Sequence, residues 1–324
     1  MISKEIIKKH LDICLDDTSY LNIPGIKRGK VRDSFDLGDK LLLITTDRQS
    51  AFDRVLANIP FKGQVLNQVS EFWFKSTSHI VKNHIISIPD PNVTLAKKCK
   101  VFPIEFVVRG YLTGSTDTSA WTLYSRGVRN ICGNVLNEGM VKNQKFDKPI
   151  LTPTTKSDAH DEPISSEEII KRNIIDEKTW NKLQSIVFAL FEHGCQVADS
   201  HGLILVDTKY ELGTDENGEI ILIDEIHTPD SSRYWLKDSY QKRFAEQKEP
   251  ENIDKEFLRL WFKAHCDPYK DAVLPKAPDD LVVELSSRYI TLYEMITGSR
   301  FSTNNIPVKE RILKNLKDAG IIKD

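Results

Sequence analysis

One short stretch limits the possible folds of this chain more than any other. Residues 205–212 read LVDTKYEL, a run rich in the residue types that favour β-strands. Side chains alternate between the two faces of a strand, so Asp207, Lys209 and Glu211 share one face, opposite a mainly apolar one. The pattern predicts a half-buried strand with three charges on one side. A charged face of this kind is most often simply exposed to solvent. The residues that follow in the sequence favour a functional role for it.

The next residues predict a β-hairpin. The sequence GTDENGEIILIDEI contains Asn217-Gly218, a strong signal for a two-residue turn, and then a second strand. With this dipeptide as the loop, Glu211 lies opposite Asp224, with the two side chains about 5 Å apart. A loop two residues longer places Lys209 opposite Asp224 instead. In either register Asp224 joins the charged face, because directly paired residues point to the same side of a sheet.

Facing carboxylates repel each other unless a positive charge lies between them. A divalent cation meets this need, and a small number of hard oxygen ligands suits Mg²⁺ that also carries phosphates and waters. We therefore expect Glu211 and Asp224 to bind a metal ion.

Composition excludes several classes of partner. The chain has 324 residues, enough for two lobes, and its 45 basic and 47 acidic side chains leave a formal charge of -2. This balance offers no electrostatic basis for binding nucleic acid or an anionic membrane. Five cysteines without a C-x-x-C pair indicate a reducing, cytoplasmic setting, and neither a signal peptide nor a membrane-span-length apolar run is evident. The sequence leaves a monomer and a homodimer equally open.

Three regions are expected along the chain. Residues 1–110 are rich in strand signals and predict an N-terminal nucleotide-binding lobe. Residues 111–275 alternate helical and strand patterns and include the charged hairpin, so they predict a mixed α/β lobe with the metal and substrate site. Residues 276–324 predict two helices, ended by Gly298 and Gly320, that pack on the second lobe.

Further motifs carry side chains suited to anionic ligands, although each one has an ordinary structural explanation. The basic residues Arg28, Lys30 and Arg32 are expected on one strand face, which suits a triphosphate but also describes an exposed basic edge. The turn TTDRQSAFD has a capping role or a ligand role with equal weight. VVRGYLTGS delivers Arg109 and Ser115 beside glycines that allow a phosphate or carboxylate to approach the backbone. LTPTTKSDAHDE is a polar loop of the kind that is often functional, and DEIHTPDSSRYW presents an arginine just after the charged hairpin.

Together the segments RGKVRD, TTDRQSAFD, VVRGYLTGS, LTPTTKSDAHDE, LVDTKYELG and DEIHTPDSSRYW resemble, in this order, the longer form of the SAICAR synthetase (phosphoribosylaminoimidazole-succinocarboxamide synthase) family. The resemblance spans roughly residues 25–300. Gln49 replaces the aliphatic residue that is usual in the family's D-R-x-S-A motif, and the stretch after Ser115 differs from the shorter bacterial form.

The resemblance implies an α+β fold: an antiparallel-sheet N-terminal lobe, a larger mixed α/β lobe, ATP in the cleft between them, and C-terminal helices. It implies a carbon–nitrogen ligase that joins L-aspartate to carboxyaminoimidazole ribonucleotide and releases ADP and phosphate. A carboxylate accepts an amine poorly until it is phosphorylated, so an acyl phosphate is the expected intermediate. ATP and Mg²⁺ are the implied cosubstrate and metal.

The resemblance also implies roles for individual residues. Lys209 would neutralise the transferring phosphoryl group and Asp207 would accept hydrogen bonds from the imidazole amine or the ribose. The implied nucleotide-binding residues are Lys30, Arg32 and Glu211, and the implied metal ligands are Glu211 and Asp224. The implied substrate-binding residues are Arg109, Ser115, Asp207, Arg233 and Arg259 for the ribonucleotide, Lys156 and Asp161 for aspartate, and Asp47 and Ser50 of the D-R-x-S-A loop.

Two other classes of function fit the residues alone. A phosphotransferase of kinase-like architecture would also need a basic strand and paired carboxylates, but it would need no aspartate subsite. A non-catalytic nucleotide sensor would bind metal and nucleotide without forming product.

Overall fold

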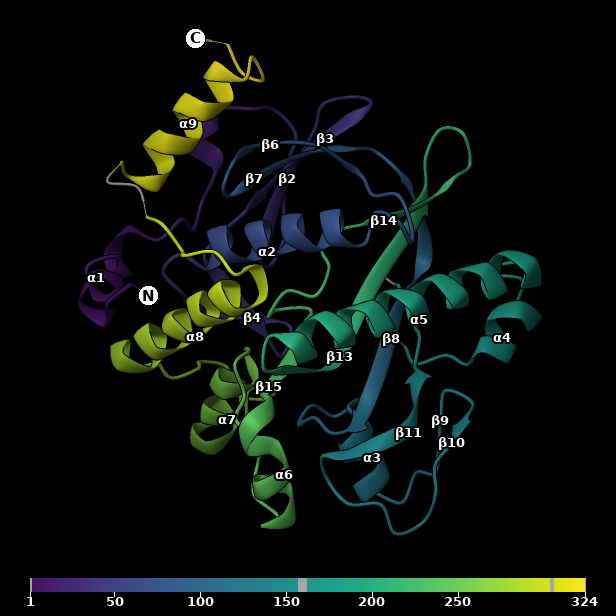
Figure 1. The fold of residues 1–324 in the computed structure, drawn as a ribbon. Helices are drawn as coiled ribbons and strands as arrows, with labels where there is room; N and C mark the ends of the chain where they lie inside the picture. The colour runs from purple at the N-terminus through teal and green to yellow at the C-terminus, as the bar shows by residue number, and fades with distance from the viewer. Residues whose placement is uncertain (1, 157–161, 304–305, 324) are drawn as a thin grey trace. The chain divides into compact units, whose positions relative to one another are not determined.

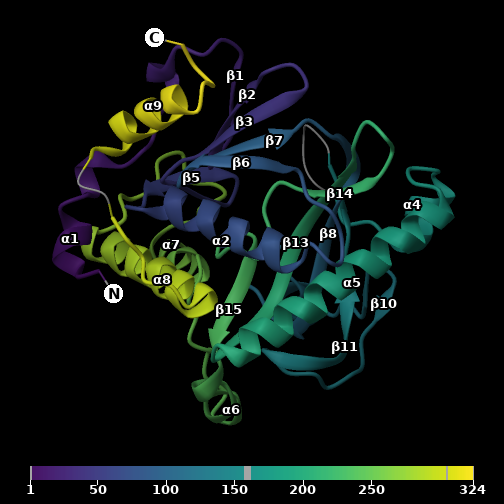
Figure 2. The same ribbon diagram turned by 45° about the horizontal axis from the view of Figure 1, so that its top comes forward.

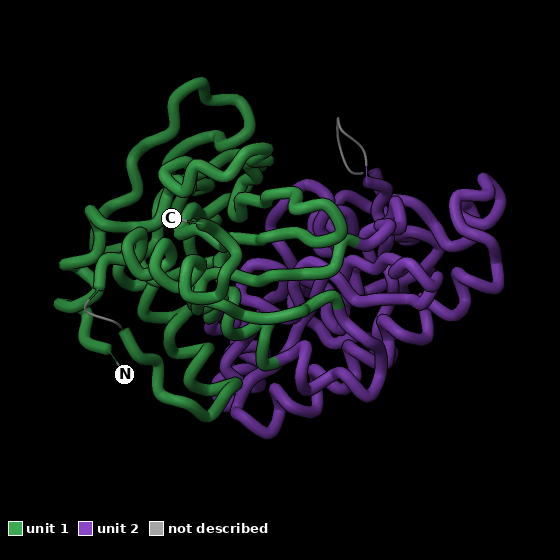
Figure 3. The backbone as a smooth tube through the Cα atoms, turned by 90° about the horizontal axis from the view of Figure 1, so that it is seen from above, with its two compact units in different colours: residues 1–72, 84–98, 253–324 green, residues 73–83, 99–252 purple. Residues whose placement is uncertain are grey.

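Antiparallel sheets lie at the centre of both units into which this computed structural model divides (Figures 1 and 3). The structure describes residues 2–156, 162–303 and 306–323. One unit comprises residues 1–72, 84–98 and 253–324, and the other comprises residues 73–83 and 99–252. The mixed α and β architecture with antiparallel sheets and C-terminal helices confirms the expected fold class.

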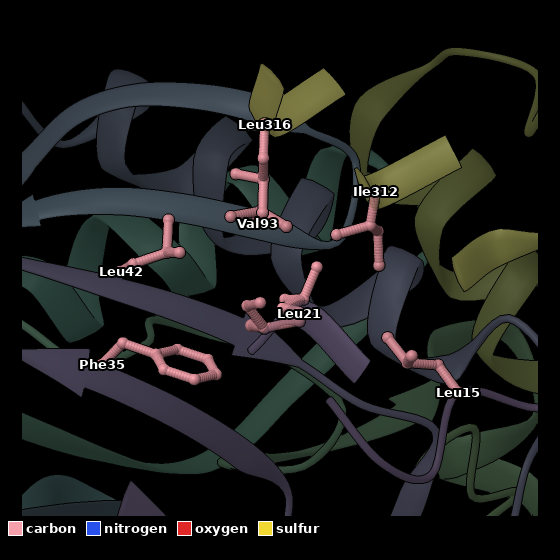
Figure 4. Close-up of a cluster of buried hydrophobic side chains, with 8 residues drawn as sticks. Leu15, Leu21, Phe35, Leu42, Val93, Ile312 and Leu316 are labelled. Carbon is pink, nitrogen blue, oxygen red and sulfur yellow. The ribbon is translucent and has the colours of Figure 1, made fainter. Parts of the chain in front are cut away.

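The first unit is built around a five-stranded sheet with the strand order β1-β2-β3-β7-β6. Hydrophobic side chains of its strands share a core with the C-terminal helix, because Leu42 and Val93 are fully buried against Ile312 and Leu316 (Figure 4). The elements of this unit are α1 (Lys4–Lys8), β1 (Ile26–Arg28), β2 (Arg32–Asp36), β3 (Lys40–Thr45), β4 (Arg48–Ala51), β5 (Arg54–Asn58), most of α2 (Lys62–Ser76), β6 (Ile85–Asp90), β7 (Val93–Lys97), α7 (Glu256–His265), α8 (Asp279–Thr297) and α9 (Val308–Asp318), with short 3-10 helices at Leu11–Ile13 and Ser19–Leu21.

The second unit is built around a larger antiparallel sheet whose main path is β11-β8-β13-β14. Two further strands join it, since β12 pairs with β8 and β15 pairs with β13. Its elements are β8 (Lys100–Leu112), α3 (Ala120–Ser125), β9 (Asn130–Ile131), β10 (Asn134–Val135), β11 (Gln144–Leu151), β12 (Thr154–Thr155), α4 (Ser166–Lys171), α5 (Glu177–Ser200), β13 (Leu203–Thr214), β14 (Ile220–Ile223), β15 (Ser232–Leu236) and α6 (Lys237–Ala245).

The long helix α5 covers one face of this sheet (Figures 1 and 2). Asp176 caps the helix by accepting a hydrogen bond from the backbone N–H of Thr179, and apolar residues recur along its buried side. Trp180 stacks on Phe106 of β8 with the ring centroids 5.5 Å apart. Because α5 takes the apolar face, the opposite face of β8 and β13 can carry charge.

The expected division of the chain was wrong at two points. Strand β8 was assigned to the N-terminal lobe up to residue 110, but it pairs with β13 and belongs to the second unit. The C-terminal helices were expected on the second lobe, but they pack in the first: α9 contributes to the core described above, and Ser286 of α8 donates to the carbonyl of Pro60 at 2.7 Å. Strand and helix signals are local, and they carry no information about which distant segment covers which sheet.

Across the part of the chain that the structure describes, every helix is too short or too polar to cross a membrane.

Candidate functional site

The charged face predicted from the sequence exists in the second unit. Strand β13 pairs with β8 on one side and β15 on the other, and the register places Asp207 opposite both Arg109 and Arg233. Two residues further along β13 lies Lys209, and two further lies Glu211, which faces Glu105 of β8. Side chains directly opposite each other share a face, so one surface of three strands gathers both arginines and an alternating row of acids and a lysine.

The first cluster on this face consists of two arginines around one carboxylate. Oδ2 of Asp207 lies 2.7 Å from Nη1 of Arg233 and 3.5 Å from Nη1 of Arg109, and all three side chains are largely buried. Arg109 also donates through Nε to the hydroxyl of Thr152 at 2.9 Å. Burial lowers the pKa of Arg109, and Asp207 opposes this effect while Arg233 adds to it. Holding two guanidinium groups this close needs the shared carboxylate.

Gly114, the residue before Ser115, lies close to one arginine of this cluster. The backbone of Gly114 has a φ of +106°, and a Cβ built there would lie 3.1 Å from Nη2 of Arg233 and 2.5 Å from Cβ of Ser119. Only glycine fits this approach without displacing a neighbour. The predicted substrate residues Arg109, Asp207 and Arg233 are brought together in the structure, and Ser115 follows the glycine that lies beside Arg233.

The second cluster is a row of alternating charges. Nζ of Lys209 lies 2.7 Å from Oε1 of Glu211 and 2.7 Å from Oε1 of Glu105, and the ammonium of Lys156 contacts Oε2 of Glu211. Burial alone would lower the pKa of Lys209, but the carboxylates of Glu211, Asp224 and Glu105 outweigh burial and raise it above its ordinary value. Lys209 is therefore held as an ammonium ion at neutral pH.

The predicted hairpin register was wrong by one residue. Glu211 pairs with Ile223, not with Asp224, and Thr214 pairs with Ile220. The loop contains three residues between Asp215 and Glu219, with Gly218 at a φ of +77°, which is the usual geometry of a three-residue hairpin loop.

The carboxylate of Asp215 explains the longer loop. It accepts hydrogen bonds from the backbone N–H groups of Asn217 at 3.0 Å and Glu219 at 2.9 Å, which stabilises a turn wider than Asn-Gly alone would favour. A slip of one residue would send Asp224 to the apolar face if the strand continued. Strand β14 ends at Ile223, however, and Asp224 adopts a φ of +66°, so it leaves the strand and remains among the carboxylates that raise the pKa of Lys209.

The residues present fit a magnesium ion that arrives with its nucleotide. Among the described residues there is no group of three or more His, Cys, Asp or Glu side chains arranged to hold a metal ion by themselves. Mg²⁺ is commonly bound by one or two carboxylates together with substrate phosphates and waters, rather than by a complete protein cage. Glu211, with Asp224 close to the same ammonium, supplies carboxylates of this kind.

The basic motif in the first unit forms a hairpin and not a single strand. Arg28 ends β1, Arg32 begins β2, and Lys30 lies between them at the turn. The N–H of Gly29 donates to the carbonyl of Arg32 at 2.9 Å, and a Cβ at Gly29 would lie only 2.6 Å from that oxygen. Glycine therefore makes the reversal possible, which explains why the prediction of one shared strand face was wrong.

Arg48 of β4 stabilises this turn through its guanidinium group. Its guanidinium forms a buried ion pair with Asp33 and donates to the carbonyl oxygens of Gly29 at 2.9 Å and Asp16 at 2.6 Å. Lys30 itself is half exposed and paired with Asp53. The hydrogen bond to Gly29 fixes the backbone next to Lys30, the predicted phosphate-binding lysine.

The remaining predicted residues have the following environments. Asp47 is buried and accepts hydrogen bonds from the backbone N–H groups of Leu15 at 2.7 Å and Gly63 at 2.9 Å, so the structure favours the capping role for this residue. Burial raises the pKa of Asp47 to about 6, although the two hydrogen bonds act to lower it.

Ser50 is half buried in β4, and Arg259 of α7 pairs with Glu256 at 3.2 Å. Asp161 lies outside the described residues.

Glu105 has no role in the sequence predictions, and Arg48 was considered only as part of the turn TTDRQSAFD. Glu105 could have been found by counting back from Arg109 in steps of two along PIEFVVRG, which keeps it on the arginine's face. The support that Arg48 gives to the Gly29 turn could not have been found in this way, because no local pattern predicts that the Arg48 side chain of β4 reaches the Gly29 carbonyl.

Comparisons with known proteins show the family to which the chain belongs. The family model described as SAICAR synthetase matches residues 25–276. Phosphoribosylaminoimidazole-succinocarboxamide synthase of Legionella pneumophila (strain Paris) is 60% identical over 309 residues, which cover 95% of this chain and 99% of the relative. A solved SAICAR synthase from Saccharomyces cerevisiae, in complex with SAICAR, has a TM-score of 0.77 and 34% identity over 89% of this chain and 100% of its own. A SAICAR synthetase solved in complex with ADP has a TM-score of 0.66 and 25% identity, covering 86% of this chain and 100% of its own. The chain belongs to the SAICAR synthetase family.

Proposed function

We propose that the charged face of β8, β13 and β15 carries out the reaction of this family. The chain is an ATP-dependent carbon–nitrogen ligase of purine biosynthesis: it joins L-aspartate to carboxyaminoimidazole ribonucleotide and gives SAICAR, ADP and phosphate. The observation that carries the assignment of the site is the order of charges on one face, where an arginine pair is followed by a lysine among three carboxylates.

The reaction needs an activation step followed by an attack. Phosphorylation of the substrate carboxylate by ATP would give an acyl phosphate, and the amine of aspartate would displace the phosphate from it. Each step moves a negatively charged phosphoryl group, so the protein must supply fixed positive charge and keep the reacting groups together.

Lys209 is the proposed source of that fixed charge. Its ammonium is held in place by Glu105 and Glu211, each at 2.7 Å, so little reorganisation is needed when charge develops on the transferring group. Glu211 and Asp224 would hold Mg²⁺, which when bound neutralises phosphate charge and orients the nucleotide. The solved relative with ADP supports nucleotide use by this fold.

Arg109, Arg233 and Ser115 are the proposed contacts of the ribonucleotide. Guanidinium groups bind phosphate and carboxylate through pairs of parallel N–H donors, and an arginine has five such donors. Asp207 would hold both arginines in position, because its carboxylate is buried between them. It would therefore act on the substrate through the two arginines.

Lys30 and Arg32 are the proposed ATP phosphate contacts, presented by the turn that Arg48 supports. Arg259 is proposed for the ribonucleotide phosphate and Ser50 for substrate, whereas the contacts of Asp47 favour a structural role. Lys156 and Asp161 remain the proposed aspartate subsite.

A reducing compartment such as the cytoplasm is proposed, because all five cysteines are free thiols.

One assay separates this function from its rivals. ADP release is measured with carboxyaminoimidazole ribonucleotide and L-aspartate supplied singly and together. We expect sustained turnover only with both substrates, with SAICAR formed in equal amount to ADP. Sustained ADP release that does not depend on aspartate would indicate a phosphotransferase, and nucleotide binding without turnover under any condition would indicate a sensor.

A further inference from the structure

Glu105 is the one member of the charged row that no sequence motif assigned, and its contacts differ from those of Glu211. Glu211 is shared between Lys209 and Lys156, whereas Lys209 is the one cation that contacts Glu105 among the described residues. The Glu105 side chain is 15% exposed, so its charge is poorly screened by water.

The surroundings of Glu105 fix its carboxylate. Glu105 lies in the interior of β8, where its backbone pairs with Glu211 of β13 on one side and with Thr154 of β12 on the other. The hydroxyl of Thr154 lies 3.4 Å from Oε2 of Glu105, while Oε1 faces Lys209. Both neighbouring strands therefore hold the carboxylate in the direction of the ammonium.

Lysine needs such a partner because its side chain is long and flexible. Fixing one lysine side chain costs conformational entropy, which a single salt bridge offsets poorly. Two carboxylates at 2.7 Å on neighbouring strands define the position of Nζ from two directions. If Glu211 is drawn toward a metal ion, as the proposed function requires, Glu105 is the one of these two carboxylates that keeps its contact with Lys209.

We infer that Glu105 is a positioning residue for the reaction: it holds the Lys209 ammonium in position while Glu211 serves the metal and nucleotide. The inference rests on the proposed function, because it concerns the group on which Lys209 is proposed to act. Glu105 does not touch the substrate in this scheme, so its loss should affect the rate and leave substrate affinity nearly unchanged.

The experiment compares kcat and KM in three variants. Glu105→Gln removes the charge without changing the shape, and Glu105→Asp keeps the charge but withdraws it by one methylene from Lys209. We expect both to lower kcat by about 10-fold to 100-fold, with KM for each substrate changed by less than about twofold. Glu138→Gln is the matched control, since Glu138 forms an ion pair at 2.8 Å with Arg129 in the same unit and its side chain is 78% exposed. We expect wild-type kcat for this control.

The Mg²⁺ dependence and Lys209→Met distinguish the possible failures. If raising Mg²⁺ restores the wild-type kcat of Glu105→Gln, Glu105 acts as a metal ligand and the inference is wrong. If Lys209→Met loses about 10²-fold to 10³-fold in kcat while both Glu105 variants keep the wild-type kcat, the inference is wrong and the proposed function stands. If Lys209→Met keeps the wild-type kcat, the proposed role of Lys209 fails, and the inference fails with it. Glu105→Asp keeps the test decisive if Glu105→Gln does not fold.

Discussion

At the residue scale, the ammonium of Lys156 forms an ion pair with Glu211, the carboxylate that the proposed magnesium site needs. Its Nζ contacts Oε2 of Glu211, while Lys209 takes the other oxygen. Lys156 was expected to serve the aspartate subsite. Both roles are compatible if the ammonium leaves Glu211 when a divalent cation arrives and is then available for a substrate carboxylate.

This competition predicts that Lys156→Met binds divalent cations more tightly. The Lys156 side chain is 34% exposed, so its ion pair is worth at most about 1 kcal/mol, or roughly fivefold in affinity. The measurement is a Mn²⁺ titration in the presence of ADP, followed by electron paramagnetic resonance. Lys178→Met, at an exposed lysine of α5, is the control and should bind Mn²⁺ like the wild type. Unchanged or weaker binding by Lys156→Met would show that the two cations do not compete.

Residue identity on the charged face could be predicted from sequence because strand periodicity is strict. Asp207, Lys209 and Glu211 share a face for the same reason that Glu105 and Arg109 do. The ion-pair partners of these side chains were not predictable. Lys156, which follows β12, contacts Glu211 of β13, and no local sequence rule links these two segments.

At the scale of elements, the hairpin shows where a turn rule fails. Asn217-Gly218 predicted a turn correctly, and the left-handed backbone of Gly218 is what such a turn requires. Loop length was wrong because the Asp215 side chain bonds two backbone N–H groups and stabilises one more loop residue. Asp224 stayed near Lys209 only because the strand ends before it.

The motif DEIHTPDSSRYW contains a second element-scale feature, a buried histidine behind the charged strand. Nε2 of His227 lies 2.5 Å from the hydroxyl of Tyr210, and a Cβ at Gly194 of α5 would lie 2.4 Å from the His227 ring. Burial, and to a smaller extent His193, lowers the pKa of His227 from 6.5 to about 3. The neutral ring is therefore part of the packing between α5 and β13.

This pKa predicts how stability depends on pH. Between pH 6.5 and 3 an unfolded chain binds a proton at this histidine and the folded chain does not, so the free energy of unfolding falls as the pH falls. The contribution of one such group is up to about 1.4 kcal/mol per pH unit. Denaturant unfolding of the wild type and His227→Gln at pH 7, 6 and 5 measures it.

We expect His227→Gln to be less stable at pH 7 but to lose less stability on acidification than the wild type does. His265→Gln, at an exposed histidine of α7, is the control. Equal losses in the wild type and His227→Gln would mean that His227 does not titrate in this way.

At the scale of the whole molecule, each unit is assembled from separate stretches of chain, and sequence patterns alone did not predict this. The first unit combines the N-terminal strands with helices from residues 253–324, and the Ile312 and Leu316 side chains complete its core. Gln49, which departs from the family motif, is fully buried in β4 and accepts a hydrogen bond from the Tyr289 hydroxyl of α8 at 3.1 Å. Helix α8 thus supplies the partner that a polar residue needs at this position.

The family and reaction could be inferred from six motifs, because they recur in the family's order along the chain, and both were confirmed by the relatives. The strand-rich beginning, the charged hairpin and the terminal helices also followed from periodicity and turn residues. The pairing of distant segments did not, because it depends on which apolar faces fit together after collapse.

The most direct measurement of the central claim is the rate of SAICAR formation by Glu211→Gln across a range of Mg²⁺ concentrations. Glu219→Gln is its matched control, because Glu219 lies in the same hairpin but is half exposed and paired with Lys82. We expect Glu211→Gln to lose about 100-fold or more in kcat, without recovery at high Mg²⁺, and Glu219→Gln to match the wild type. A wild-type rate for Glu211→Gln at every Mg²⁺ concentration would contradict the assignment of this face as the catalytic site.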